Sequence, residues 1–252
     1  MIHLFPGGAR TTQITEVTGL GVRSAAITLA RDGSAMEFLL FPMLHFAQPS
    51  FYAEVRRRLE RCAVIVSEGI AGPTPQSDAM EFANRYFPRG RQRGIVGQTD
   101  EIVLPAGIPV IRPDDVPPAV PALDLRGIPG LKRLALVTGI NLALVTSTHV
   151  ISTALAIAGP RVLCTKDLEI HDFAFTAQEQ CVADTALAHT LMDARDRALL
   201  RTLAGLHEQR CLEPIRVGVV YGAAHMPAVS QGLADRYRYQ PRKAEWMTVY
   251  AG

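Results

Sequence analysis

The chain has 252 residues, of which 48% are hydrophobic and 20% charged, and its formal net charge at pH 7 is +2. This composition excludes a disordered chain, a coiled coil and a collagen-like repeat. The small net charge gives no overall field that would attract nucleic acid or an anionic membrane. We therefore expect a globular protein that does not bind nucleic acid.

The cysteines and the amino terminus predict the cellular compartment. The four cysteines form no CxxC pair and are too sparse for a disulfide framework in a chain of this length. Residues 1–10 lack the apolar stretch of a secretory signal peptide. These features favour a cytoplasmic protein.

Periodicity and turn signals predict an α/β fold, with a mixed central sheet flanked by helices in a single domain over residues 1–252. Short β-branched runs between turn residues indicate strands. Phe51, Val55 and Leu59 recur every fourth residue, as on one face of a helix. Thr176 and Glu179 form a capping box that opens a long helix. In chain order, the expected elements are strands at 14–18, 22–30 and 35–41, a helix at 49–61, a strand at 63–67, helices at 76–86 and 176–206, a strand at 215–221, a helix at 227–234 and a strand at 246–250.

Two sections interrupt this pattern. Residues 99–131 are rich in proline, which removes backbone donors, and are expected to form a long loop or lid. Residues 132–160 are expected to form an inserted apolar helical section. This section is long enough to cross a bilayer, but its many polar groups favour buried helices or a helical hairpin over a membrane span. A homodimer formed through this apolar section is a further expectation.

Two similar units place a histidine after a strand. Pro42-Met43-Leu44-His45 follows one predicted strand, and Gly222-Ala223-Ala224-His225 follows another; each precedes a helix with an early proline. We interpret these strand–xxxH–helix units as an internal repeat. Glu68 directly follows a third predicted strand. Ligands bind at the carboxyl ends of strands in α/β sheets, so these three side chains are expected to converge.

An arginine lies on the apolar face of the long helix. Arg195 is four residues after Leu191 and four before Leu199, on the same stripe. A buried guanidinium needs an anionic partner, which predicts contact with Glu68, a substrate oxyanion or a carboxylate. The alternative is a side chain whose stem packs while its head reaches water. The adjacent Asp196 and Arg197 are expected at the surface.

These motifs resemble one protein family. The TraB/PrgY/Tiki family, which is related to erythromycin-esterase-like and ChaN-like proteins, is similar to this chain in the segments FPMLHFAQPSFYAEV, IVSEGI, DARDRALL and VGVVYGAAHMPAV. The family signature maps onto His45, Glu68, Arg195 with Asp196, and His225. The first motif has Pro42 where the family has glycine. The resemblance implies a hydrolytic or metal-binding site, beside which Tyr52, Gln98 and Tyr221 are expected to contact the substrate.

Three functions are compatible with these residues. In the first, His45, Glu68 and His225 bind Mn²⁺, Co²⁺ or Zn²⁺, and the protein hydrolyses a peptide, amide or ester bond, with Arg195 stabilising the oxyanion. In the second, no metal is needed and His45, oriented by Glu68, is the general base of an esterase-like hydrolase. The third is a non-hydrolytic protein that is biosynthetic or that binds and regulates peptides. No GxSxG motif is present, which disfavours a serine nucleophile.

The arginines of 56–61 and 85–93 form a basic cluster in the sequence. They are interpreted as a solvated helix face followed by a loop, or alternatively as a patch that binds phosphate or acidic groups.

Overall fold

The computed structural model describes residues 2–4, 10–69, 94–113, 164 and 186–252. Its centre is a seven-stranded mixed sheet with the order β11-β4-β5-β10-β7-β9, in which β3 also pairs with β4. The predicted α/β class is confirmed. The strands are β3 (Thr15–Thr18), β4 (Gly21–Ala30), β5 (Glu37–Met43), β7 (Val64–Ser67), β9 (Val110–Ile111), β10 (Arg216–Gly222) and β11 (Gln240–Ala251).

The sheet divides into a parallel half and an antiparallel half. Strands β5, β10, β7 and β9 are parallel neighbours, whereas β11, β4 and β3 are antiparallel additions beside them. The parallel strands are almost continuously apolar, because helices cover both of their faces. The antiparallel half carries more exposed polar residues, especially along β11.

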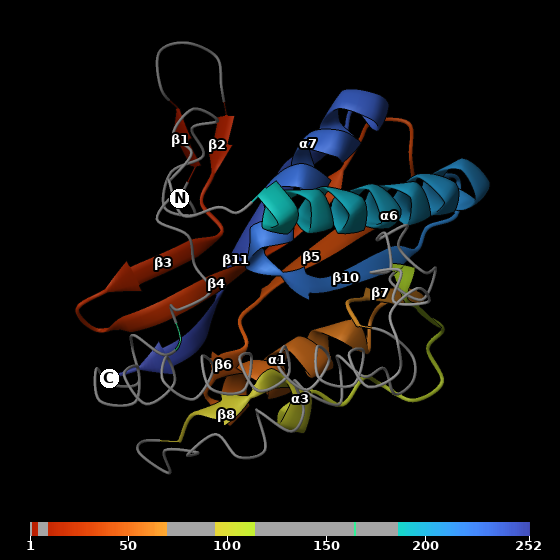
Figure 1. Cartoon of the computed structure of the whole chain (residues 1–252). Helices are drawn as coiled ribbons and strands as arrows, with labels where there is room; N and C mark the ends of the chain where they lie inside the picture. Colours follow the sequence, from red (N-terminus) through yellow and green to blue (C-terminus); the bar gives the residue numbers. More distant parts are fainter. Residues whose placement is uncertain (1, 5–9, 70–93, 114–163, 165–185) are drawn as a thin grey trace, which may run out of the picture.

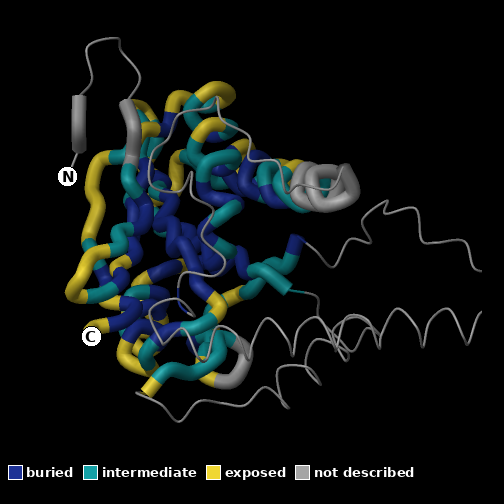
Figure 2. The backbone as a smooth tube through the Cα atoms, turned by 60° about the vertical axis from the view of Figure 1, so that its left-hand side comes forward, coloured by how far each residue is buried: buried dark blue, intermediate teal, exposed yellow. Residues whose placement is uncertain are grey.

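Helices cover the two faces of the sheet and enclose two cores (Figure 1). On one face, α6 (Ala186–Arg210) and α7 (Met226–Tyr237) pack Leu199, Leu203 and Leu233 against the strands. On the other face, α1 (Pro49–Leu59) packs Phe51, Tyr52, Val55 and Leu59. The buried stretches of the backbone run through the centre of the molecule between these layers (Figure 2).

Each of the two predicted strand–xxxH–helix units is present, but the units differ in their connections. Between β5 and α1 the chain forms β6 (Phe46–Ala47), which pairs with β8 (Val96–Gly97). Between β10 and α7 it forms a 3₁₀ turn, Ala223–His225. Both helices have proline in their first turn, where no backbone donor is needed. They cover opposite faces of the sheet, because α1 belongs to one core and α7 to the other.

Two regions are more regular than the sequence predicted. Strand β11 begins at Gln240, not at 246, because backbone pairing with β4 orders an exposed, charged stretch that has no apolar pattern. The expected loop 99–131 includes most of a short helix, α3 (Gln98–Glu101), and strand β9. Strand β9 adds to the edge of the sheet beside β7, where flanking prolines are tolerated. A separate two-stranded sheet pairs β1 (Ile2–Leu4) with β2 (Arg10–Thr12).

Several predictions fall outside the described residues: the helix at 76–86, the loop beyond 113, the apolar section 132–160 and the capping box at 176–179. Within the described ranges, no helix is both long enough and apolar enough to cross a membrane.

Candidate functional site

The ends of three parallel strands bring the predicted site residues to one edge of the sheet. In the register of the sheet, Gly222 of β10 lies opposite Met43 of β5, and Val220 lies opposite Ser67 of β7. His45, Glu68 and His225 follow these strands by two, one and three residues. Their placement at a common carboxyl edge agrees with the prediction.

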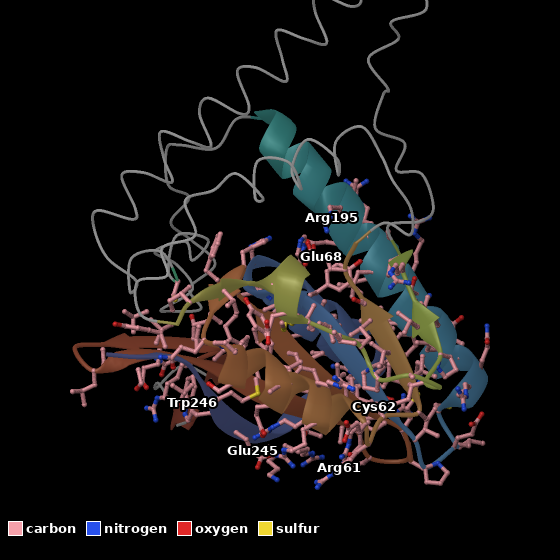
Figure 3. All side chains as sticks on the ribbon, turned by 90° about the horizontal axis from the view of Figure 1, so that it is seen from below. Arg61, Cys62, Glu68, Arg195, Glu245 and Trp246 are labelled. Carbon is pink, nitrogen blue, oxygen red and sulfur yellow. The ribbon has the colours of Figure 1, made fainter. Side chains whose placement is uncertain are left out.

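Glu68 is held by two donors. Its Oε1 accepts a hydrogen bond from Arg195 Nη2 at 2.5 Å, and its Oε2 accepts one from the backbone N–H of Gly222 at 2.7 Å. The side chains of Arg195 and Glu68 are 34% and 20% exposed, so the ion pair is half-buried. Figure 3 shows the two residues facing one another from α6 and from the end of β7. The predicted contact between Arg195 and Glu68 is therefore present.

The position of Arg195 follows from the apolar stripe of α6. Leu199 and Leu203 are completely buried, and Arg195 lies one turn before Leu199 on the same face. At this point the helix passes the edge of the sheet, so its inward face meets a carboxylate in place of apolar side chains. The sequence signal for this contact was a cation on an apolar stripe.

His225 forms the second pair of the site. Its Nδ1 lies 2.6 Å from Asp196 Oδ1, and its side chain is 4% exposed. The carboxylate can only accept, so Nδ1 carries the proton and, in the neutral imidazole, Nε2 presents its lone pair. The ring also packs edge-on against Tyr221, with 5.5 Å between the ring centroids. His225 is thus oriented by Asp196 on one side and by an aromatic ring on another.

Asp196 does not lie at the surface, where we expected it. Its side chain is 19% exposed and bonds His225. Only residues in line with the leucine stripe were taken as inward, and the next residue is turned by about 100° around the helix. Helix α6 also packs against α7, which begins directly after His225, so a second face of α6 is covered. Arg197 is exposed, as predicted.

His45 occupies the bend that follows β5, and its residue is exposed. Its backbone carbonyl accepts a hydrogen bond from the N–H of Gln98 at 2.8 Å. The structure therefore forms two side-chain pairs, Glu68 with Arg195 and Asp196 with His225, and His45 lies at the same edge of the sheet.

Two of the three predicted substrate contacts, Tyr52 and Tyr221, are buried. Tyr52 is 1% exposed and its hydroxyl donates to the carbonyl of Leu44 at 2.9 Å, so it supports the segment before His45. Tyr221 is completely buried in β10 beneath His225. Neither ring has surface for a substrate in this structure, because both lie inside the sheet-helix layers. Gln98 contributes through its backbone N–H.

Gly222, which was predicted only as the first residue of the second histidine motif, is itself part of the site. A Cβ at this position would lie 3.3 Å from Glu68 Oε2 and 3.6 Å from His225 Cδ2. The missing side chain therefore leaves room for both groups, while the backbone N–H holds the carboxylate.

The fit of a divalent metal differs between the predicted ligands. Each oxygen of Glu68 accepts one hydrogen bond, one of them from a cation, so part of the acceptor capacity of this carboxylate is already used, and the nearby guanidinium opposes a second cation. His225 does fit, because a carboxylate on Nδ1 commonly orients a histidine that binds metal through Nε2. Among the residues that the structure describes, no three His, Cys, Asp or Glu side chains form a group that could hold a metal ion.

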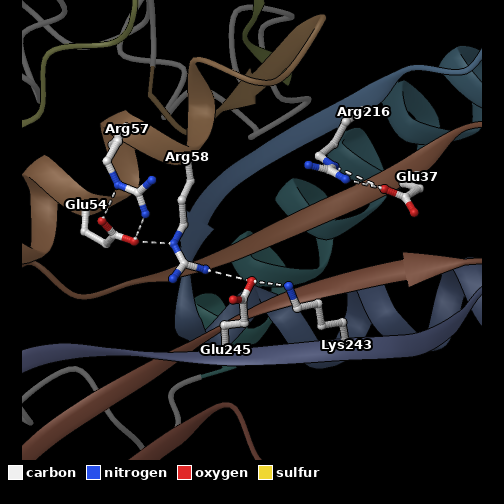
Figure 4. Close-up of polar contacts among 7 residues, drawn as sticks. All are labelled: Glu37, Glu54, Arg57, Arg58, Arg216, Lys243 and Glu245. Carbon is white, nitrogen blue, oxygen red and sulfur yellow. Dashed lines mark hydrogen bonds and ion pairs between the residues drawn. The ribbon is translucent and has the colours of Figure 1, made fainter.

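The arginine-rich helix α1 is partly used for internal contacts (Figure 4). Glu54 accepts hydrogen bonds from Arg57 and Arg58, and Arg58 reaches Glu245 on β11. The Arg57 hydrogen bond is the largest cause that lowers the pKa of Glu54, to about 2. These contacts favour the interpretation of a solvated helix face that also links α1 to the edge strand. The second arginine group, 85–93, lies outside the described residues.

Comparisons of the chain with family models, with curated proteins and with solved structures found no match in any of the three. The resemblance to the TraB/PrgY/Tiki family therefore rests on the short motifs at the sheet edge.

Proposed function

We propose that the protein is a hydrolase that activates water with the Asp196–His225 pair at the carboxyl edge of its sheet. The observation that carries this proposal is the 2.6 Å contact between Asp196 Oδ1 and His225 Nδ1. A carboxylate in this position holds the imidazole in one tautomer and stabilises the imidazolium that forms when Nε2 takes a proton. The resemblance of the motifs to the TraB/PrgY/Tiki family supports the same class of reaction.

This proposal changes the roles predicted from the sequence. In the metal-free version predicted from the sequence, His45 was the base and Glu68 the carboxylate that orients it. Glu68 instead bonds Arg195 and the N–H of Gly222, whereas Asp196 bonds His225. We therefore assign the base to His225 and give His45, which is exposed at the same edge, the role of binding the substrate or protonating the leaving group.

Arg195 supplies positive charge beside the base. Its neighbour on α6, Asp196, bonds His225, so the guanidinium and the imidazole are anchored by consecutive residues. In an acyl transfer, charge develops on the carbonyl oxygen, and a fixed cation stabilises it. Glu68 keeps the guanidinium in place, and the N–H of Gly222 in turn holds Glu68.

A metal-dependent hydrolase is the second candidate, and the same Asp–His contact favours it. His225, with Nδ1 bonded to a carboxylate, is suited to bind Mn²⁺, Co²⁺ or Zn²⁺ through Nε2. The ion would lower the pKa of a bound water and polarise the carbonyl. In this version Asp196 orients a metal ligand, and Glu68 would bind the ion through a lone pair that its present hydrogen bonds leave open.

Kinetics of Asp196→Asn and His225→Ala test the proposal, with peptide, amide and ester substrates screened on the wild-type protein first. We expect kcat to fall by roughly 10²–10⁴ in both variants, as for the loss of a general base. Asp235→Asn is the matched control, because Asp235 is an exposed carboxylate on α7 that bonds only Gln231 among the described residues. Activity that survives both substitutions would refute the proposal. Failure to hydrolyse any of the three substrate classes would favour the non-hydrolytic alternative.

Metal content separates the two versions. Elemental analysis of protein purified without chelator, for the wild type and for His225→Ala, measures whether an ion depends on this histidine. Metal that is lost in the variant, together with activity abolished by EDTA, supports the second candidate. Activity unchanged by EDTA supports the metal-free hydrolase.

The cytoplasmic location and the homodimer remain proposals. The apolar section 132–160, through which we expect the dimer to form, lies outside the described residues. Light scattering on the purified full-length chain gives the molar mass, and a monomer would refute the dimer.

A further inference from the structure

A second polar cluster lies at the opposite edge of the parallel strands from the candidate site. His207, near the end of α6, is 6% exposed although its side chain is polar. It contacts Arg31, directly after β4, and Tyr239, directly before β11. Its ring also packs against Tyr237 at the end of α7, with 4.2 Å between the ring centroids. The ends of two helices and of two strands therefore meet at one histidine.

The contacts of His207 favour its neutral form. Arg31 Nη1 lies 3.5 Å from His207 Nε2, and a guanidinium can only donate, so Nε2 must be an acceptor without a proton. Nδ1 then carries the proton and donates to the hydroxyl of Tyr239 at 3.1 Å. This arrangement suits neutral His207, because a protonated Nε2 would face the guanidinium of Arg31.

The same network continues into the turn between β4 and β5. The hydroxyl of Tyr239 lies 3.1 Å from Ser34 Oγ, and Ser34 Oγ donates to the carbonyl of Cys211 at 2.8 Å. The N–H of Ala35 also donates to the carbonyl of Cys211. His207 is therefore part of the contacts that attach the end of α6 to the strand turn.

Charged and titratable groups face His207 from every element around it. Arg31 brings a positive charge from the strand side, and Tyr237 and Tyr239 bring neutral hydroxyls. Glu208, the next residue on α6, accepts from the hydroxyl of Tyr237 at 2.5 Å. Burial lowers the pKa of His207 from its usual 6.5; Arg31 lowers it further, and Glu208 opposes both effects.

We propose that His207 is a proton-sensitive latch, which holds α6 to the 31–36 turn and to the 237–239 segment while neutral and releases them when protonated. Arg31 Nη1 also donates to the carbonyl of Tyr237 at 3.2 Å, and this bond does not depend on His207. Protonation removes the second acceptor, Nε2 of His207, and places a second positive charge against the guanidinium inside the protein. Arg195 and Asp196 lie about three turns earlier on the same helix. The latch therefore lies on the element that completes the candidate site, but the proposal does not depend on the activity of that site.

The sign of the pH effect follows from the lowered pKa. The unfolded chain binds a proton at His207 near pH 6.5, and the folded protein does so only at lower pH. The stability that neutral His207 provides is present above pH 6.5 and is lost as the pH falls toward the folded-state pKa. Acid should thus destabilise the folded protein through this residue.

The test combines two measurements on the full-length protein. NMR titration of the histidine ring protons, assigned with His207→Gln, gives the folded-state pKa of His207. Urea unfolding of the wild type and of His207→Gln from about pH 8 to about pH 5 gives the ratio of their unfolding constants. The unfolding constant of the wild type, divided by that of His207→Gln, should rise as the pH falls. The total rise should be about tenfold for each unit by which the folded-state pKa of His207 lies below its unfolded-state pKa. A folded-state pKa of His207 at or above the unfolded value, or a ratio that does not change with pH, would overturn the proposal.

Arg31→Gln is the second variant, and it keeps the histidine. Without the cation, the pKa of His207 should rise and the acid sensitivity of unfolding should decrease. This result can be read even if His207→Gln does not fold. A pKa of His207 that stays unchanged in Arg31→Gln would overturn the proposal, because protonation acts there against the charge of Arg31. Because neither measurement uses a substrate, failure of the latch is distinguishable from failure of the proposed hydrolase.

Discussion

The contact between Glu68 and Arg195 should contribute measurably to the free energy of unfolding, and a double-mutant cycle isolates its contribution. The variants are Glu68→Gln, Arg195→Gln and the combination of both. In Glu68→Gln, one of the two acceptor oxygens becomes an amide group, so either the Arg195 contact or the Gly222 contact is lost. The double variant has no ion pair left to break. The interaction energy is the difference between its loss of unfolding free energy and the sum of the losses in the two single variants.

The magnitude follows from distance and burial. Two unit charges about 4 Å apart attract by about 4 kcal/mol at the effective dielectric of a protein surface, which is an upper value here. Arg195 is 34% exposed, so water screens the pair, and desolvation of Glu68 opposes it. We expect a coupling energy of about 1–2 kcal/mol, in the range of a hydrogen bond to a charged group.

Urea unfolding, followed by the fluorescence of the single tryptophan Trp246 and by circular dichroism, measures each free energy. The control cycle is Arg210 with Glu213 at the end of α6, where the carboxylate is 47% exposed, and we expect a smaller coupling of about 0.2–1 kcal/mol. If Glu68 and Arg195 are additive within about 0.5 kcal/mol, the inference that this contact holds α6 to the sheet edge is wrong.

Three further predictions concern stability and reactivity. Gly218→Ala should destabilise the protein by about 1–3 kcal/mol in urea unfolding, because the new Cβ would lie 2.6 Å from the side chain of Leu59. Gly205→Ala is the control: nothing lies within 4 Å of the new Cβ, so this variant should stabilise α6 by about 0.5–1 kcal/mol. A Gly218→Ala protein more stable than the Gly205→Ala protein would contradict the packing. Because the pKa of Glu54 is lowered from 4.5 to about 2, its stabilising effect is present above pH 4.5 and is lost as the pH falls toward 2, so Glu54→Gln should flatten the acid side of the stability curve. Burial raises the pKa of the Cys62 thiol to about 11, so mass spectrometry after treatment with iodoacetamide at about pH 8 should find Cys62 alkylated only in unfolded protein.

The strands and helices that the sequence predicted best are those whose signal is local. Strand β5 and strand β10 are apolar runs bounded by turn residues, and α1 has a regular four-residue repeat, so the predicted bounds lie within two residues of the observed ones. The amino-terminal half of β11 was missed, because its exposed residues show no alternation and its order comes from pairing with β4, more than two hundred residues earlier. Strand β9 has only two residues and forms because β7 offers a free edge.

The candidate site was predictable to a similar extent. A cation on an apolar stripe required a buried anion, and Glu68 at a strand end was an available partner. The Asp196–His225 contact depends on where α7 starts relative to α6, which no local pattern encodes. The burial of Tyr52 and Tyr221 was not predictable for a related reason: an aromatic residue beside a motif can lie at the surface or beneath the motif, and only packing decides.

The order of the two charged residues on α6 specifies how this helix sits on the sheet. Consecutive helical residues point about 100° apart, so one helix that crosses the sheet edge can direct Arg195 to the end of β7 and Asp196 to the histidine after β10. A rotation of α6 that exchanged these positions would bring Asp196 against the Glu68 carboxylate and remove the acceptor from His225. Leu199 and Leu203 hold the helix against the sheet, but an apolar face tolerates small rotations. The Arg195–Glu68 and Asp196–His225 pairs do not tolerate such rotations, because each needs its own partner. The contacts that arrange the candidate site therefore also fix the rotation of α6 against the sheet.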